Sequence, residues 1–155
     1  MEMSTVAQTV IAGVLVFVAG QLFLKLVIEP VHQLKKTMAE ISHIFIRYAH
    51  AIHNPDVISE ELRREVFEKL RQLSGQLYAD MALIPLYSVF GRLFFLPCRE
   101  DVYKSAKNLI AVANWMHSKS DTRFDHIIRN IQSACDRLGL YIAPEDRIAE
   151  ELLSK

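Results

Sequence analysis

The chain is poor in the residues on which several fold classes depend. Its 155 residues include two cysteines, and Cys98 and Cys135 form no disulfide framework and lack the paired spacing of a zinc site. Five glycines and five prolines are too few for a collagen-like, disordered or many-stranded β protein. Basic and acidic residues number 18 each, so overall charge indicates no nucleic-acid partner. Any charged site must therefore be local.

Motifs for common enzyme chemistries are also missing. The sequence contains no Gly-rich phosphate loop, no HExxH and no GxSxG. His50 and His53 share a helical face, but no adjacent carboxylate or thiolate completes a ligand set. Nothing in the sequence brings Cys98 and His117 together as nucleophile and base. We therefore predict no enzyme activity, no cofactor and no bound metal.

One long apolar run is present near the N-terminus. Residues 6–28 read VAQTVIAGVLVFVAGQLFLKLVI, with Lys25 as the only charge. A helix of this length reaches about 35 Å, which is enough to cross a hydrocarbon core of about 30 Å. A cleaved signal peptide would need basic residues before the run, and only Glu2 is charged there. Because Lys25 lies near the end of the run and Lys35 and Lys36 follow it, we predict a span of the bacterial inner membrane with its N-terminus outside.

Polar and small residues interrupt this predicted transmembrane helix, residues 1–29. Small residues let helices approach closely in a bilayer, and amide side chains hydrogen-bond between helices. The alternative is that water at the cytoplasmic boundary satisfies Gln21. We expect the span to self-associate, as a tetramer or a larger ring. Its pore-lining or helix-packing residues would be Gln8, Thr9, Gly13, Gly20 and Gln21.

A juxtamembrane stalk helix is predicted over residues 30–54. Pro30 either kinks one continuous helix or begins a new one. The apolar stripe of this helix packs either against copies of itself or against later helices of the same chain. We expect self-association near the membrane and internal packing further away. Its apolar residues alternate at spacings of three and four, as heptad a and d positions do: Val31, Leu34, Met38, Ile41, Phe45, Tyr48 and Ile52.

Residues 55–155 are predicted to form a small cytoplasmic helical domain. Apolar residues recur at helical spacing, and no segment shows sustained two-residue alternation. The whole chain is therefore expected to be all-α: one transmembrane helix, the heptad-patterned stalk and this bundle. Capping and proline signals bound its helices at Ser59, Ser120, Asp121, Gly139 and Pro144.

A second apolar stretch, residues 81–97, is broken by Pro85, Gly91 and Arg92. Its 17 residues are few for a second membrane crossing. We favour a segment buried in the domain core. The alternative is a segment on the membrane surface that inserts its aromatic side chains, Tyr87, Phe90, Phe94 and Phe95.

Basic residues concentrate between residues 92 and 123, with amides and aromatics among them. Lys104, Lys107 and Asn108 follow the i, i+3, i+4 spacing of one helical face. This composition is typical of a pocket for phosphate and base, so an anionic nucleotide or oligonucleotide is a candidate ligand. The alternatives are a solvated helix face and contact with anionic lipid headgroups. The candidate ligand-binding residues are Arg99, Lys104, Lys107, Asn108 and Asn114.

The layout resembles a known class of proteins. A single span, an EPV exit and a small helical domain are similar to membrane effectors of bacterial antiphage systems of the CBASS, type III CRISPR and Hailong kinds, in which a nucleotide signal controls an oligomeric protein that damages the membrane. The segments GQLFLKLVIEPV and IPLYSVFGRLFFLPCREDVYKSAKNLI are also similar to a widespread bacterial family of single-span proteins. The resemblance implies a homo-oligomeric effector or ion channel gated by a ligand. The alternative is a membrane-anchored adaptor that binds a cytoplasmic protein.

Overall fold

The computed structural model describes residues 5–141, and every regular element in that range is helical, as predicted. The helix expected after Pro144 lies outside the described residues. The elements are α1 (Thr5–Phe23), the short π-helix η1 (Leu24–Ile28), α2 (Glu29–Arg47), α3 (Ala49–His53), α4 (Glu60–Leu83), α5 (Tyr87–Leu93), α6 (Arg99–Trp115) and α7 (Arg123–Leu138).

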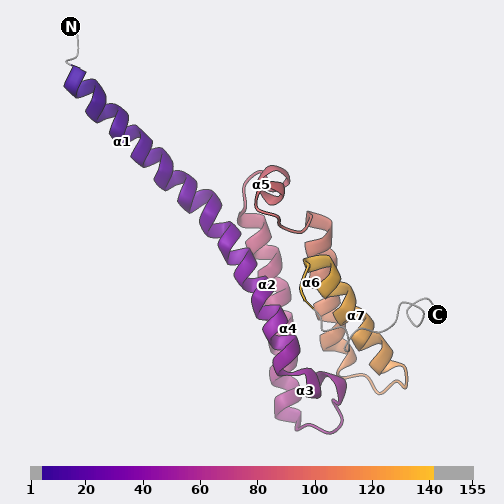
Figure 1. Ribbon diagram of the computed structural model, residues 1–155. Helices are drawn as coiled ribbons and strands as arrows, with labels where there is room; N and C mark the ends of the chain where they lie inside the picture. The colour runs from indigo at the N-terminus through magenta and orange to yellow at the C-terminus, as the bar shows by residue number, and fades with distance from the viewer. Residues whose placement is uncertain (1–4, 142–155) are drawn as a thin grey trace.

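One continuous helix of 43 residues, Thr5–Arg47, begins the described chain, and its first half projects away from the other helices (Figure 1). This half is long and apolar enough to cross a membrane, and only 6% of its most apolar stretch is buried. A helix that is apolar all round is stable only inside protein or lipid. The rest of the described chain does not supply that cover for α1.

Pro30 is accommodated without ending this helix. A proline within a helix lacks an N–H donor, and its ring crowds the carbonyl group of the preceding turn. Directly before Pro30, the hydrogen bonds of η1 widen to π spacing, and the Glu29 N–H donates to the Leu24 carbonyl. Such π segments absorb local disruption of an α-helix. The helix therefore continues through Pro30, which lies in the first turn of α2.

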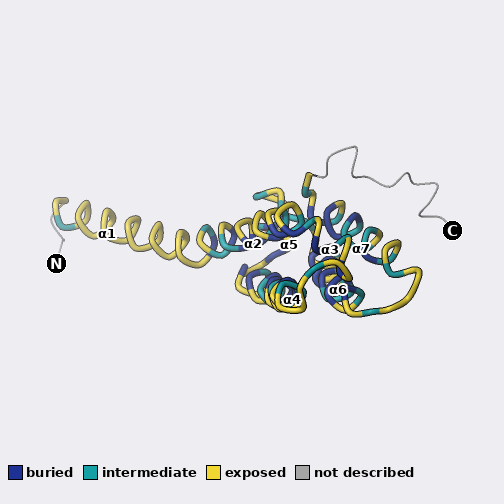
Figure 2. The backbone as a smooth tube through the Cα atoms, turned by 90° about the horizontal axis from the view of Figure 1, so that it is seen from below, coloured by how far each residue is buried: buried dark blue, intermediate teal, exposed yellow. Residues whose placement is uncertain are grey.

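Helices α2, α4, α6 and α7 form a bundle in which successive helices run in opposite directions (Figure 1). Helix α4 packs between α2 and α6, and α6 packs between α4 and α7, whereas contact between α2 and α7 is slight. Figure 2 shows that buried residues follow the inner faces of these helices, while α1 is exposed. The largest fully buried side chains include Leu34, Ile41, Leu70, Leu77, Leu109 and Ile127.

The apolar stripe of α2 points into this bundle along its whole length. Val31 is 5% exposed, and Leu34 and Ile41 are fully buried. The expectation that the stripe near α1 packs against another copy is wrong for Val31 and Leu34. The physical reason is that α4 runs back along α2 and covers them within the same chain.

Helix ends follow local capping chemistry in two places. The Ser59 hydroxyl accepts a 3.2 Å hydrogen bond from the Leu62 N–H at the start of α4, and Gly139, with φ of 66°, ends α7. The N-cap predicted at Ser120-Asp121 is wrong. Helix α7 starts after Thr122, because Ser120 is occupied in the preceding turn, where its hydroxyl accepts from the Thr122 N–H at 3.4 Å.

The second apolar stretch, residues 81–97, is partly buried and partly exposed. Ile84 and Tyr87 are buried, and the Tyr87 hydroxyl donates to the Pro97 carbonyl at 2.8 Å. The expectation of a buried core segment is therefore wrong for part of this stretch. Helix α5 is short and lies on the end of the bundle, so one of its faces packs against the bundle and the other is exposed. Five large apolar side chains remain exposed: Leu83, Leu86, Val89, Leu93 and Phe95.

Candidate functional site

The predicted ligand-binding residues lie along α6 and are spread over nearly its whole length. Arg99 and Asn114 are fifteen residues apart, which corresponds to about 22 Å along a helix. A single phosphate cannot contact both residues. The Asn108 amide is directed toward α7, where it donates a 2.9 Å hydrogen bond to the Ser133 hydroxyl. Asn108 therefore contributes to helix packing as well as to the surface.

The two lysines of this set already have partners. Lys104 Nζ lies 2.6 Å from Glu100 Oε1 in an i, i+4 ion pair. Lys107 Nζ lies over the Tyr103 ring, 4.4 Å from its centroid. An anionic ligand at this face would have to compete with the Glu100 carboxylate, which reduces the attraction that the basic composition implies.

The predicted pore-lining or helix-packing residues are on α1, where Gln8, Thr9, Gly13, Gly20 and Gln21 are all exposed. The Thr9 hydroxyl donates to the Thr5 carbonyl of its own helix at 2.9 Å. No heavy atom lies within 4 Å of the position that a Cβ would take at Gly13 or Gly20, apart from the helix itself. This surface of α1 is open to a partner helix.

A groove of about 430 Å³ opens between α2 and α7, where the bundle is least closed. Helix α2 and the start of α3 supply one wall: Ser42, Phe45, Ile46 and Ala49. Helix α7 supplies the other: Ile128, Ile131, Gln132 and Cys135. Both sets recur at spacings of three and four residues, so each helix presents an apolar stripe about two turns long. Ile46 at the rim is 75% exposed, so this apolar surface is incompletely covered.

Gln132 is the polar exception in the α7 wall of the groove. It is 8% exposed, and its Oε1 has no hydrogen-bond partner among the described residues. Leaving a buried acceptor unpaired costs about 1–3 kcal/mol, and native proteins contain few such groups. The unpaired oxygen marks a position where an incoming hydrogen-bond donor would be stabilised.

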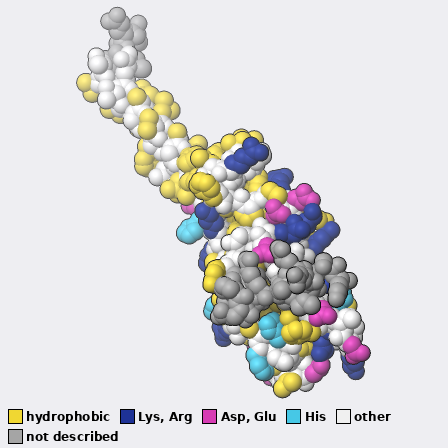
Figure 3. All heavy atoms as spheres, turned by 45° about the vertical axis from the view of Figure 1, so that its right-hand side comes forward, with side chains coloured by type: hydrophobic (Ala, Val, Ile, Leu, Met, Phe, Trp, Pro, Cys, Tyr) yellow, Lys and Arg dark blue, Asp and Glu magenta, His cyan; other side chains and the backbone are white. Residues whose placement is uncertain are grey.

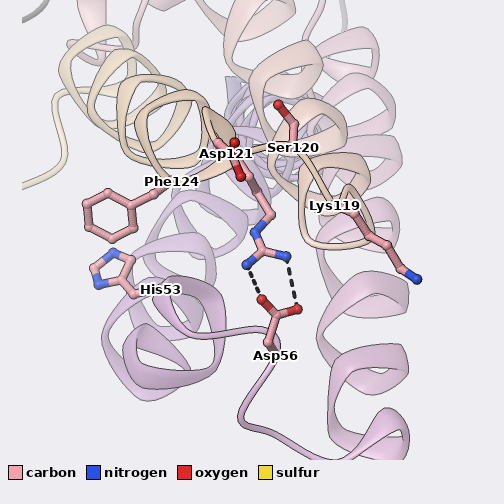
Figure 4. A pocket seen from close by; sticks show the side chains of 7 residues that line it. His53, Asp56, Lys119, Ser120, Asp121 and Phe124 are labelled. Carbon is pink, nitrogen blue, oxygen red and sulfur yellow. Dashed lines mark hydrogen bonds and ion pairs between the residues drawn. The ribbon is translucent and has the colours of Figure 1, made fainter.

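A polar pocket of about 460 Å³, shown in Figure 4, adjoins the groove near α3, at the end of the bundle away from α1 (Figure 1). Arg123 forms two hydrogen bonds with the Asp56 carboxylate, one of them 3.1 Å between Nη1 and Oδ1. The Arg123 hydrogen bond holds the pKa of Asp56 below its usual value, so the pair stays ionised and its charges cancel. His53 lines both hollows, and its ring meets Phe124 edge to face. The pocket thus extends an apolar groove with polar but nearly neutral surface.

Sequence reasoning missed both hollows. Asp56 and Arg123 are 67 positions apart, and no local pattern joins them. Gln132 gave the one usable signal, because it interrupts the apolar spacing of its helix. In residues 5–141, no group of three His, Cys, Asp or Glu side chains is placed to hold a metal ion.

Comparison with known proteins finds no family model, no curated protein and no solved structure that matches this chain. Its function must therefore be inferred from the chemistry of these surfaces.

Proposed function

We propose that the chain is a membrane-anchored adaptor, whose groove between α2 and α7 binds a short amphipathic helix of a cytoplasmic protein. The observation that carries this proposal is the unpaired, buried Gln132 Oε1 in a two-sided apolar groove. The partner helix would present apolar side chains at i, i+3 and i+4, with one donor side chain directed at Gln132.

A helix fits this groove better than a small polar ligand does. The two walls are stripes of antiparallel helices, and ridges of a third helix pack naturally into such a channel. The lining is mostly aliphatic and aromatic, so burial of apolar area supplies the driving force. A charged metabolite would find neither a cluster of cations nor a neutralising counter-ion in the groove walls.

Anchoring is the second part of the proposal. Helix α1 has no buried residue, so a bilayer is the environment that accounts for its predominantly apolar surface. Lys25 at the end of the span, and Lys35 and Lys36 after it, favour a cytoplasmic location for the bundle of an inner-membrane protein. The groove would then face the cytoplasm, where a protein partner can reach it.

Site-specific photocrosslinking in bacterial cells tests the groove. A photoreactive phenylalanine derivative at Ile46 should crosslink to one protein of defined mass. The same photoreactive residue at Arg64, on the exposed face of α4 where the side chain is 78% exposed, should give no such crosslink. Ile128→Asp should abolish the Ile46 crosslink while leaving the protein folded, because a carboxylate in an apolar groove is poorly solvated. Equal crosslinking at both positions, or an Ile46 crosslink that survives Ile128→Asp, would contradict the groove assignment.

A second candidate is the homo-oligomeric membrane effector or ion channel of the sequence analysis, for which antiphage defence is the expected role. The observation that favours it is the open space at Gly13 and Gly20, which are seven residues apart and so share a face of α1. In this case Gln8, Thr9 and Gln21 would line or pack a pore. A nucleotide or oligonucleotide would bind along α6 and gate the span.

The two candidates differ in what they require of α1. A channel should lose activity with Gly20→Leu or Gln21→Leu, whereas an adaptor should tolerate replacement of the whole span by an unrelated one. The mass of the detergent-purified full chain gives an independent check. A defined tetramer or larger ring would support the channel hypothesis. A monomer would contradict it and support the adaptor hypothesis.

A further inference from the structure

Helix α5 and its flanking residues expose a continuous apolar patch at the end of the bundle next to α1. Leu83, Leu86, Val89, Leu93 and Phe95 are each at least 58% exposed, and Phe95 is 93% exposed. Scattered apolar residues are ordinary on a protein surface, but a concentration of this kind marks an interaction surface. Figure 3 shows apolar side chains continuing from α1 onto the adjoining end of the bundle, with Lys and Arg side chains beside them.

The patch lies at the level where α1 ends. The rings of Phe23 and Phe90 meet edge to face with their centroids 6.1 Å apart, so α5 rests against the last turn of α1 (Figure 1). Leu24 and Leu26, in the next turn, are 44% and 59% exposed. A single apolar surface therefore runs from the span around its base and onto α5.

Backbone geometry directs two of these side chains outward. Leu86 and Phe95 have φ of 45° and 54°, and they are the two non-glycine residues with positive φ in the described part of the chain. This conformation is unfavourable for residues with a Cβ and is typically retained where a function requires it. The two residues flank α5, and both are largely exposed, so the strain cannot be attributed to burial of their side chains in the bundle.

Basic side chains border the patch. Arg92 is exposed in the last turn of α5, and the Arg99 guanidinium lies 5.6 Å from the centroid of the Tyr87 ring. Both arginines line the same shallow hollow of about 250 Å³ at the corner between α5 and α6. Apolar residues bordered by arginines are the composition of a segment that lies in a membrane interface, where anionic headgroups pair with the cations.

We propose that this α5 patch inserts into the headgroup region of the same bilayer leaflet that α1 enters, and so holds the bundle in one orientation against the membrane. The inference rests on the proposed anchoring by α1. Lipid is the occupant because the patch is continuous with the surface of the span and level with its end. The residues inserted would be the leucines, Val89 and Phe95. Of the aromatic set expected from the sequence, only Phe95 is among them, because Tyr87 is buried and Phe90 and Phe94 are partly buried against the core.

Tryptophan quenching by brominated lipid tests the proposal on the full chain. In a Trp115→Phe background, a single tryptophan is introduced by Val89→Trp, and in separate proteins by Leu15→Trp in α1 and by Ile46→Trp on α2. Each protein is placed in vesicles of phosphatidylcholine and phosphatidylglycerol with bromine on the upper acyl chain. We expect the tryptophans at positions 89 and 15 to lose most of their fluorescence, and the tryptophan at position 46 to keep its fluorescence.

The three positions separate the possible failures. Quenching at position 15 without quenching at position 89 overturns the insertion of α5 and leaves the anchoring intact. No quenching at position 15 overturns the anchoring itself. Because a substitution at Val89 can disturb folding, Leu93→Trp provides a second probe of the patch, and circular dichroism checks each protein. Absence of quenching at both α5 positions in folded protein would show that something other than lipid covers the patch.

Discussion

The Thr37 hydroxyl donates a 2.6 Å hydrogen bond to Asp80 Oδ2, joining α2 to α4 inside the bundle. Thr37 is 1% exposed and Asp80 is 5% exposed. A carboxyl group removed from water is costly unless donors compensate it. Because the pair links the long N-terminal helix to the second helix of the bundle, it fixes the register between the two.

We expect Thr37→Val to lower the free energy of unfolding by about 1–3 kcal/mol, because the substitution keeps the side-chain volume and leaves a buried acceptor without its donor. Thr37→Ser, which retains the hydroxyl, should lose less. Chemical denaturation in detergent, followed by circular dichroism, measures both. Equal stability of the two variants would mean that the hydroxyl does not support Asp80.

Two glycines should respond to alanine in opposite directions. Gly75 is exposed within α4, and no heavy atom outside its own helix lies within 4 Å of the position of its Cβ. Gly75→Ala should therefore raise the free energy of unfolding by about 0.5–1 kcal/mol through helix propensity. Gly139 has φ of 66° at the end of α7, so Gly139→Ala should lower the free energy by about 1–2 kcal/mol. Thermal unfolding compares the pair, and a shift of the same sign in both would contradict the assigned geometry.

Acid should weaken a hydrogen-bonded cluster that joins α4 to Tyr48, the residue between α2 and α3. Lys69 Nζ donates to Glu65 Oε1 at 2.6 Å, and the Tyr48 hydroxyl donates to the same oxygen at 2.7 Å. These two hydrogen bonds, that of Lys69 first, lower the pKa of the Glu65 carboxyl from its ordinary value of 4.5. The contribution to stability is therefore complete above that value and is lost as the pH falls through the lowered pKa.

Glu65→Gln removes this titration. We expect the variant to be less stable than the parent at neutral pH and to lose less stability when the pH is taken below 4.5. Glu61→Gln, an exposed neighbour in the first turn of α4, is the matched control. Unfolding midpoints of the parent and of both variants, measured from neutral pH to below 4.5, compare their acid sensitivity. If the two variants follow the same pH profile, the cluster does not set the acid sensitivity.

The features that could be predicted from the sequence are those that depend on neighbouring residues. The caps at Ser59 and Gly139 each depend on a few adjacent positions, and the apolar stripe of α2 is a spacing within one helix. Leu86 gave no such signal, because leucine has no intrinsic preference for the left-handed conformation that it adopts before α5. The local pattern of residues 81–97 showed that they are apolar, but not which of them would be left uncovered.

The groove could not be predicted for a related reason. Ile128 has the spacing of an ordinary core position, and Ile46 lies beside the apolar stripe of α2 rather than in it, so neither residue by itself indicates an open groove. Whether they are covered depends on how closely α2 and α7 approach, and that distance is set by α4 and α6, which lie between them in the packing order. A gap between the first and last helices of a bundle is a tertiary property, and Gln132 is the one residue in these two helices whose type hinted at it.

Gln132→Met tests the groove by separating stability from binding. The substitution nearly conserves volume and removes a buried acceptor that has no partner in residues 5–141, so the free energy of unfolding should rise by about 1 kcal/mol. The same change should lower the yield of the photocrosslink from position 46, because the donor side chain of the partner loses its acceptor.

Gln72→Met, on the exposed face of α4, is the matched control and should change neither the free energy of unfolding nor the crosslink yield. A site under selection for binding commonly retains a group that its own fold would be more stable without. Destabilisation by Gln132→Met would instead show that the oxygen is already satisfied, and the groove would lose the feature that assigns it a protein partner.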